Sequence, residues 1–236
     1  MSIQRSETRG GADYGWLKTK HSFSFGSYYN RARMGFGPLR VINEDEVAPG
    51  RGFDAHPHSD MEILSYVVSG KLTHQDSLGS KSTIFAGQVQ KLSAGSGIIH
   101  SEYNGSKEEP VKFLQIWIEP NRAGVAPSYD EGDFSEALKN GELVLIASPS
   151  GENGSMRLLQ DARVWIANTS TEKAFSLEGK ANTQYWVQVV SGELVVNEEV
   201  LSPGDGFGLR EVDTLHISTS QSGAHFLVFE LPKEKE

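Results

Sequence analysis

The sequence predicts an all-β protein made of two domains, each a β-barrel or β-sandwich. Short segments rich in β-branched and aromatic residues alternate with Gly, Pro, Asn and Asp, which is typical of strands joined by tight turns. The 25 glycines favour a turn-rich architecture over long helices. The chain has 236 residues, enough for two domains of about 100–130 residues that each bury a core.

Six segments have the clearest strand character, because β-branched and aromatic side chains are frequent in them. They are Ser22–Tyr29, Leu39–Asn43, Ile63–Val68, Lys71–Asp76, Val111–Ile118 and Tyr185–Val190. Helical periodicity is found in Asp133–Asn140, with Asp133 as a candidate N-cap and Gly141 after the last turn. Because a helix of about two turns is too short to form a scaffold, we expect it to connect the two domains.

A weak internal repeat indicates that the two domains are duplicates. Three pairs of features recur in the same order in the two halves of the chain. They are Val67–Leu72 with Val189–Leu194, Ala86–Leu92 with Pro203–Leu209, and His100 with His216. We therefore place an N-terminal domain at residues 1–132 and a C-terminal domain at residues 133–236.

The composition excludes several classes of protein. The net charge of −9 argues against a nucleic-acid partner, which requires a cationic face. No apolar run approaches the length of a membrane span, and the first residues lack the apolar stretch of a signal peptide, so we expect a cytoplasmic protein. Since the chain has no Cys, a bound metal must be held by His and carboxylates.

Two short motifs carry candidate metal ligands. His56-Pro57-His58 is an H-x-H pair, and His100-Ser101-Glu102 is an H-x-E pair. Residues i and i+2 of a strand point to the same face, so each pair presents two ligands together. If the two strands are neighbours, three imidazoles and one carboxylate converge. Such a set suits a first-row divalent metal with positions left open for substrate and dioxygen.

The glycine context of these pairs resembles the two sequence motifs of the cupin superfamily. Gly50 and Gly70 flank the H-x-H pair, as glycines do in the first cupin motif. The spacing departs from the usual one, because Glu62 is one position away from that of the usual Glu ligand. The residues alone therefore leave two candidate carboxylates, Glu62 and Glu102.

A longer resemblance covers roughly residues 10–130 and points to the pirin family of bicupins. The stretches that carry it are His21–Tyr29, Met34–Asn43, His56–Tyr66, His74–Ser77 and Gly97–Asn104. The resemblance implies a bicupin of two jelly-roll β-barrel domains with a short connecting helix. It also implies that the metal ligands are His56, His58, His100 and Glu102, which leaves Glu62 as an acid outside the ligand set.

The same resemblance implies quercetin 2,3-dioxygenase activity, with a flavonol and dioxygen as substrates. Here the metal would act as a Lewis acid on the flavonol 3-hydroxyl, and Glu102 would be both a ligand and the base that takes its proton. The alternative is a non-enzymatic, metal-dependent regulator of a transcription or metabolic protein partner. A different cupin reaction, such as sugar isomerisation or decarboxylation, is a third hypothesis.

Three further expectations concern the metal and its surroundings. We expect one divalent transition metal, with Fe(II) favoured and Mn, Co, Ni, Cu or Zn as alternatives. The C-terminal domain is expected to be metal-free, because His216 has no companion ligands in the repeat. His21 and His74 are interpreted either as pocket or hydrogen-bonding residues near the ligands or as structural histidines.

Overall fold

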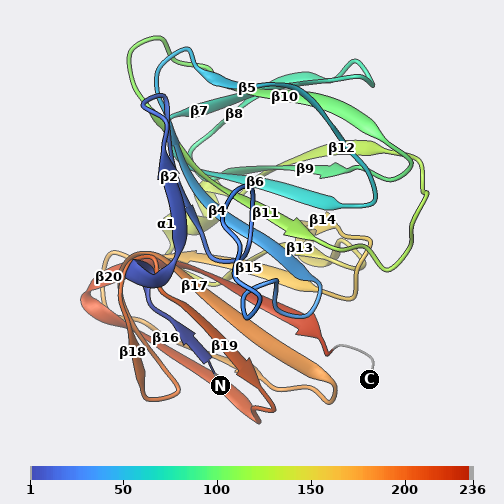
Figure 1. The fold of residues 1–236 in the computed structure, drawn as a ribbon. Helices are drawn as coiled ribbons and strands as arrows, with labels where there is room; N and C mark the ends of the chain where they lie inside the picture. The colour runs from blue at the N-terminus through green and yellow to red at the C-terminus, as the bar shows by residue number, and fades with distance from the viewer. Residues whose placement is uncertain (1, 234–236) are drawn as a thin grey trace. The chain divides into compact units, whose positions relative to one another are not determined.

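The predicted all-β fold is confirmed by the structure, a computed structural model that describes residues 2–233 (Figure 1). Its strands are joined by tight turns, and its one α-helix within those residues is α1 (Ser135–Lys139). Two 3-10 turns, η1 (Ser6–Thr8) and η2 (Glu152–Gly154), complete the helical content of the same range. None of the helices within residues 2–233 is long and apolar enough to cross a membrane.

The chain divides into two compact units. The N-terminal unit contains residues 10–35 and 39–133, and the C-terminal unit contains residues 134–233 together with 2–9 and 36–38. The division predicted from the sequence lies one residue earlier, and both short segments were expected in the N-terminal domain. The structure differs because strand pairing and aromatic packing, which act over long sequence separations, attach these segments to the C-terminal unit.

Those two segments have identifiable contacts within the C-terminal unit. Strand β1 (Ser2–Gln4) pairs antiparallel with β19 (Gly206–Arg210). The ring of Phe36 packs against Trp186 with 5.5 Å between their centroids. Gly37 has a φ of 55°, and a Cβ there would overlap the side-chain amide of Gln184. A glycine is therefore needed at this close approach.

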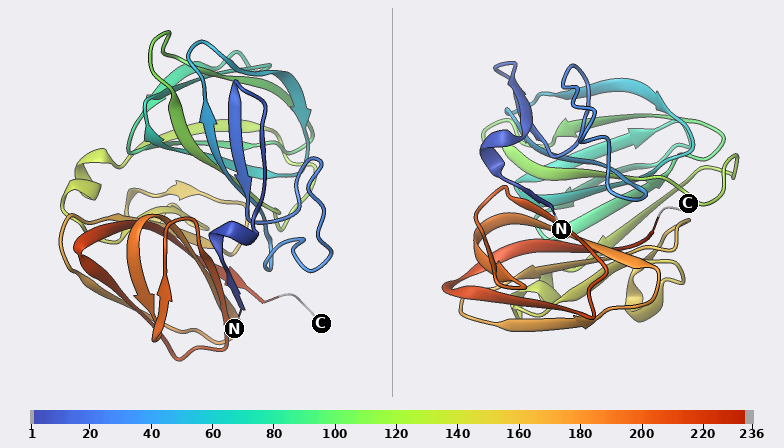
Figure 2. Two further views of the ribbon diagram at one scale, coloured as in Figure 1. Left: turned by 60° about the vertical axis from the view of Figure 1, so that its left-hand side comes forward. Right: turned by 60° about the horizontal axis from the view of Figure 1, so that its bottom comes forward.

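The N-terminal unit consists of two antiparallel sheets that form opposite layers (Figures 1 and 2). The seven-stranded sheet has the order β12 (Ser128–Asp133), β9 (Gln88–Ser93), β6 (Glu62–Ser69), β11 (Val111–Ile118), β4 (Leu39–Val47), β3 (Leu17–His21) and β2 (Gly10–Asp13). The four-stranded sheet has the order β5 (Gly52–His58), β10 (Ile98–Asn104), β7 (Lys71–Asp76) and β8 (Lys81–Phe85). Side chains from both sheets fill the space between them.

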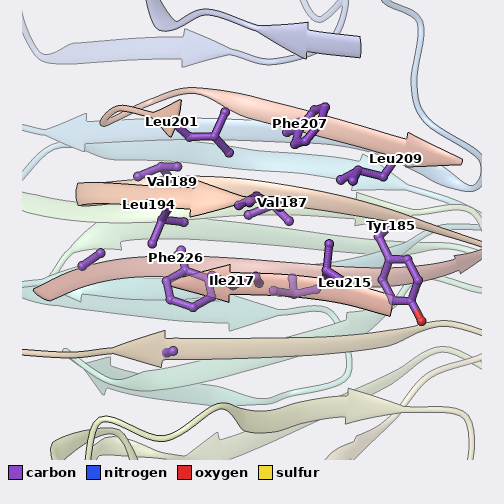
Figure 3. Close-up of a cluster of buried hydrophobic side chains, with 14 residues drawn as sticks. Tyr185, Val187, Val189, Leu194, Leu201, Phe207, Leu209, Leu215, Ile217 and Phe226 are labelled. Atoms are coloured by element: carbon purple, nitrogen blue, oxygen red, sulfur yellow. The ribbon is translucent and has the colours of Figure 1, made fainter. Parts of the chain in front are cut away.

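The C-terminal unit is one curled sheet organised by two long strands, β17 (Thr183–Val196) and β20 (Thr214–Pro232). Besides β1 and β19, the sheet contains β13 (Val144–Ser148), β14 (Met156–Arg157), β15 (Arg163–Asn168), β16 (Ala174–Glu178) and β18 (Glu199–Leu201). Apolar side chains from β17, β18, β19 and β20 pack into a single cluster, which Figure 3 shows in close-up. Burial of such side chains stabilises each unit by roughly 25 cal/mol per Å² of apolar surface removed from water.

Two local predictions were wrong. Ser22–Tyr29 is not a strand but a turn-rich segment with one isolated bridge between Phe25 and Tyr28, because its serines and a glycine interrupt the aromatic run. The helix is shorter than expected: its N-cap position is held by Phe134, while Asp133 ends β12. Gly141 follows the helix with a φ of 65°, as the sequence predicted.

Candidate metal centre

A layer of polar side chains crosses the interior of the N-terminal unit between two apolar clusters. On β6, Ser65 lies between the inward residues Ile63 and Val67, which belong to different clusters. The other members of this layer also lie at inward positions of their own strands, next to inward apolar residues. We call this set the polar layer; its members are Ser65, His74, Gln90, Glu102 and Gln115, all of them buried.

Three imidazoles meet at one end of this layer. Strands β5 and β10 pair so that His56 lies directly opposite His100, and His58 is two residues farther along β5. Ring centroids are 4.6 Å apart for His56 and His100 and 4.9 Å apart for His58 and His100. One nitrogen from each of the three rings lies within 4.8 Å of the others. The structure thus brings all three predicted histidines together.

The surroundings orient two of these rings. The Nδ1 of His56 is 2.7 Å from the backbone oxygen of Asp54, which can only accept, so Nδ1 carries the proton and Nε2 keeps a free lone pair. The ring of His58 packs edge-on against Trp117, with 4.9 Å between centroids. Trp117 in turn meets Phe25 edge-on at 5.4 Å. These aromatic contacts restrict the rotation of His58.

Two imidazoles of this group are held neutral. Burial, together with His100 and His56, lowers the pKa of His58 to about 4, although the charge of Glu102 opposes this shift. Burial, His56 and His74 lower the pKa of His100 to about 3, with Asp76 acting in the opposite direction. At neutral pH both rings therefore have a lone pair, which is the state that binds a metal.

Glu102 is buried and accepts hydrogen bonds from three side chains. Its Oε1 accepts from Ser65 Oγ at 2.8 Å and from Gln90 Nε2 at 2.5 Å. Its Oε2 accepts from Gln115 Nε2 at 2.7 Å. These donors come from β6, β9 and β11 of the opposite sheet, so they fix the carboxylate between the layers. Hydrogen bonds to a charged group of this kind are each stabilising by about 1.5–3 kcal/mol.

The four predicted ligands do not form one group at this spacing. Glu102 groups with His100 and with His74, whose ligand atoms also lie within 4.8 Å of one another. His100 therefore belongs to both groups. Ser65, Gln90 and Gln115 were not among the predicted site residues. A signal was present for Ser65 and Gln115, because each is a polar residue at an inward position of a largely apolar strand, but not for Gln90, whose strand is mostly polar.

Two other candidates lie outside both groups. Glu62 follows a break after His58 and starts a strand of the opposite sheet, so parity along one regular strand does not relate it to the histidines. It is also three residues from Ser65, which places it on the other face of β6, where its carboxylate lies 4.0 Å from Lys91. His21 is buried, and its Nδ1 is 2.7 Å from Asn43 Oδ1.

The C-terminal unit has a different interior. His216, which the repeat pairs with His100, is exposed, whereas its neighbours Leu215 and Ile217 are buried in the apolar cluster. His216 therefore does not occupy the inward position that His100 has in the N-terminal unit. The expectation of a metal-free C-terminal domain stays a prediction.

A hollow of about 480 Å³ opens beside His58. Its lining comes from the end of β5, the start of β10 and the turn after β7, and includes Pro57, Ser77 and Ile99. This volume is within the range of about 300–1,000 Å³ that is usual for small-molecule sites. Of the three histidines only His58 lines this hollow, and Pro57 and Ile99 are exposed residues that alternate with the inward histidines along their strands.

One observation indicates that the ligand atoms of this cluster suit a divalent metal. The Nε2 of His100 is buried and has no hydrogen-bond partner within residues 2–233. A buried polar atom without a partner is costly, and it is rare in folded proteins. A metal bound among His56, His58 and His100 would satisfy this atom, and the neutral state of the rings suits imidazole ligation.

The fold and this cluster define a bicupin with a candidate metal centre in its N-terminal half. The chain belongs to the pirin family: residues 3–118 match the Pirin family model, and residues 145–231 match that of the quercetinase C-terminal cupin domain. The resemblance seen in the sequence is thereby confirmed.

Relatives and solved structures agree with this assignment. Quercetin 2,3-dioxygenase of Escherichia coli K12 is 40% identical over 98% of both chains. A pirin-like protein of Caulobacter vibrioides is 43% identical over 93% of this chain and 94% of its own. The structure of the bacterial pirin YhhW from Escherichia coli in complex with nickel(II) superimposes with a TM-score of 0.93, at 38% identity and 99% coverage of both chains.

Proposed function

We propose that this protein is a metal-dependent dioxygenase that opens the heterocycle of a flavonol, with His56, His58, His100 and Glu102 as the metal ligands. The observation that carries the proposal is the convergence of three imidazoles at a buried His100 Nε2 that lacks a partner in the described chain. The name of the Escherichia coli relative, quercetin 2,3-dioxygenase, supports the substrate class. We favour Fe(II) as the metal, and nickel(II) is bound in the related structure.

A metal held there would supply Lewis acidity to the flavonol 3-oxygen and a site for dioxygen chemistry. The protein's own residues do the rest. The hollow beside His58 receives the aromatic substrate, and Trp117 and Phe25 extend the aromatic surface next to that imidazole. In this proposal Glu102 accepts the proton of the 3-hydroxyl: the O–H bond breaks, and the proton moves to a carboxylate oxygen.

The hydrogen bonds to Glu102 limit where on the carboxylate that proton can bind. Both carboxylate oxygens already accept from amide or hydroxyl donors, so the proton must arrive at a remaining lone pair or displace Gln115 from Oε2. Gln115 Oε1 lies 3.2 Å from Ser65 Oγ. Because Ser65 has a single hydroxyl proton, Gln115 can accept it only when Ser65 no longer donates to Glu102 Oε1.

The test measures quercetin and dioxygen consumption by full-length protein loaded separately with each candidate metal. We expect one metal per chain and equal molar consumption of both substrates. Glu102→Gln should reduce turnover at saturating quercetin by about 10²–10⁴-fold relative to bound metal, which is the usual effect of losing a general base. Glu62→Gln is the matched control, since it removes a buried carboxylate on the opposite face of β6 and should retain metal and activity.

Two results would overturn the proposal. Tight binding of one metal without turnover for any candidate metal would remove the enzyme and leave a metal-binding protein. A loss of metal in Glu62→Gln, with metal retained in Glu102→Gln, would show that the carboxylate ligand was assigned to the wrong residue.

A further inference from the structure

A second hydrogen-bonded chain lies behind His100 and ends at a buried acid. The Nε2 of His74 is 2.9 Å from Asp76 Oδ2, and both side chains are fully buried. The Nδ1 of His74 faces the Nδ1 of His100 at 3.4 Å. Tyr129 stacks on the His74 ring at 4.3 Å, with 17° between the ring planes, and so holds its orientation.

This order of groups determines where each proton is. The Asp76 carboxylate accepts from Nε2–H of His74, and in this tautomer the Nδ1 of the His74 ring has a lone pair. Two lone pairs cannot face each other favourably, so the Nδ1 of His100 carries the proton and donates it to His74. The Nε2 of His100 is then left bare, and this is the buried atom without a partner in the described chain.

We infer that Asp76 and His74 are positioning residues that fix the tautomer of His100 so that its Nε2 presents a lone pair to the metal site. His56 reaches the same tautomer through the backbone oxygen of Asp54. The Nδ1 of His100 faces His74 and uses the His74–Asp76 pair instead. The inference rests on the proposed metal site, and it adds residues that touch neither metal nor substrate.

His74 is a positioning residue and not a ligand in this arrangement. Its two nitrogens are both engaged, one by Asp76 and the other by His100. If a metal lay instead among His74, His100 and Glu102, it would take the Nδ1 atoms of both rings. The Nε2 of His100 would then stay buried without any partner, at the cost that an unpaired polar group carries.

The substitution Asp76→Asn gives a sharp test because the structure fixes how the new amide must point. Asp76 Oδ1 accepts from the backbone N–H groups of Leu78 at 2.9 Å and Ser80 at 3.0 Å. In the variant the amide oxygen must keep these two bonds, so its NH2 group faces His74. His74 then accepts at Nε2 and donates from Nδ1, and His100 is forced to carry its proton on Nε2.

The experiment records two-bond ¹H–¹⁵N spectra of histidine-labelled, metal-free full-length protein, in which the two tautomers are distinguished directly. We expect His100 to be protonated on Nδ1 in the wild type and on Nε2 in Asp76→Asn. Calorimetry with Ni(II) should show affinity weakened by about 10–100-fold in this variant, the usual effect of losing a group that orients a ligand. His74→Gln retains a donor for Asp76 and an acceptor for His100, so its Ni(II) affinity should fall less than that of Asp76→Asn.

The matched control is Asp205→Asn in the C-terminal unit. Asp205 is also buried and also accepts backbone N–H groups, from Ser6 at 2.7 Å and Ser202 at 3.1 Å. This control should leave the His100 tautomer and the Ni(II) affinity unchanged. It separates the effect on the metal site from a general loss of a buried turn carboxylate.

Three outcomes would overturn the inference. One is an unchanged His100 tautomer in Asp76→Asn, and another is a Ni(II) affinity equal to that of the wild type. The third is a loss of one imidazole from the X-ray absorption spectrum of Ni(II)-loaded His74→Gln, which would make His74 a ligand. A wild-type protein that binds no metal would refute the proposed function, whereas the tautomer spectra would still decide the inference.

Discussion

Replacing His225 should remove a pH dependence of stability that originates in the C-terminal unit. His225 lies on β20 between Asn168 of β15 and Ser191 of β17, and only 6% of its surface is exposed. Burial lowers its pKa to about 4 from an ordinary value of 6.5. The folded unit therefore holds this imidazole neutral at pH values where the unfolded chain protonates it.

The sign and size follow from proton linkage. Between about pH 6.5 and pH 4 the unfolded state binds more protons, so the free energy of unfolding falls as the pH falls, and the loss is complete below about pH 4. A difference of roughly 2.5 pH units is equivalent to about 3 kcal/mol in total. Between about pH 7.5 and pH 5 the expected loss is about 2 kcal/mol.

The assay is hydrogen exchange of β15 and β20 peptides in metal-free protein, which reads the opening free energy of the C-terminal unit itself. In His225→Gln the loss between about pH 7.5 and pH 5 should be about 2 kcal/mol smaller than in the wild type. His216→Gln removes an exposed histidine of the same strand and is the matched control. Equal losses in wild type and His225→Gln would refute the argument that burial of this ring controls the pH dependence.

Two further predictions concern the walls of the metal centre. In Gly52→Ala the new Cβ would overlap the backbone oxygen of Glu102, so the β5–β10 pairing must shift. We expect the free energy of unfolding in urea to fall by about 1–3 kcal/mol and Ni(II) binding to weaken. An intact Ni(II) affinity would contradict this prediction. Gln115→Leu leaves a buried Glu102 oxygen without its 2.7 Å donor and should cost about 1–3 kcal/mol in the same urea assay. Gln88→Leu is its control, because it removes only exposed hydrogen bonds, one to Asp133 and one from the backbone N–H of Phe85, each 2.8 Å long, and should cost clearly less. Equal costs would refute the role of burial.

Much of the fold could be predicted because its signals are local. The strands around Leu39–Asn43, Ile63–Val68 and Val111–Ile118 follow from β-branched content and are present in the structure. Ser22–Tyr29 has similar residues but forms turns, because its serines and a glycine interrupt the aromatic run. The pairing of β1 with β19, by contrast, is a long-range contact that no local pattern encodes.

The site was predictable where two ligands share a strand. The i, i+2 spacing of His56 and His58 places both on one face whatever the rest of the fold does. The spacing of His100 and Glu102 likewise places both on one face of β10, which pairs regularly with β7. It does not show where Glu102 lies relative to the β5 histidines, because β5 has one extra residue between Phe53 and His56 and the register shifts there.

The surroundings of His74 and Glu62 depend on which strands are neighbours. His74 reaches His100 because β7 pairs with β10 and puts it beside Glu102 in the register. Glu62 is close to the H-x-H pair in sequence but begins a strand of the opposite sheet, on the face away from Ser65. Proximity in the sequence therefore does not reveal which of these two residues lies beside the histidine cluster.

The polar layer explains how the interior of the N-terminal unit can contain the candidate metal ligands. A buried carboxylate and two buried imidazoles are costly in a protein interior unless every polar atom is paired. In the N-terminal unit Ser65, Gln90 and Gln115 satisfy Glu102, and Asp76 satisfies His74, which leaves the Nε2 of His100 as a buried atom without a partner in the described chain. The corresponding interior of the C-terminal unit is closed by apolar side chains such as Leu215 and Phe226, so it needs no such network (Figure 3). The hydrogen-bond network and the metal ligands are thus energetically coupled. Substitutions of Gln115 or Asp76 should therefore weaken metal affinity although neither residue is a ligand.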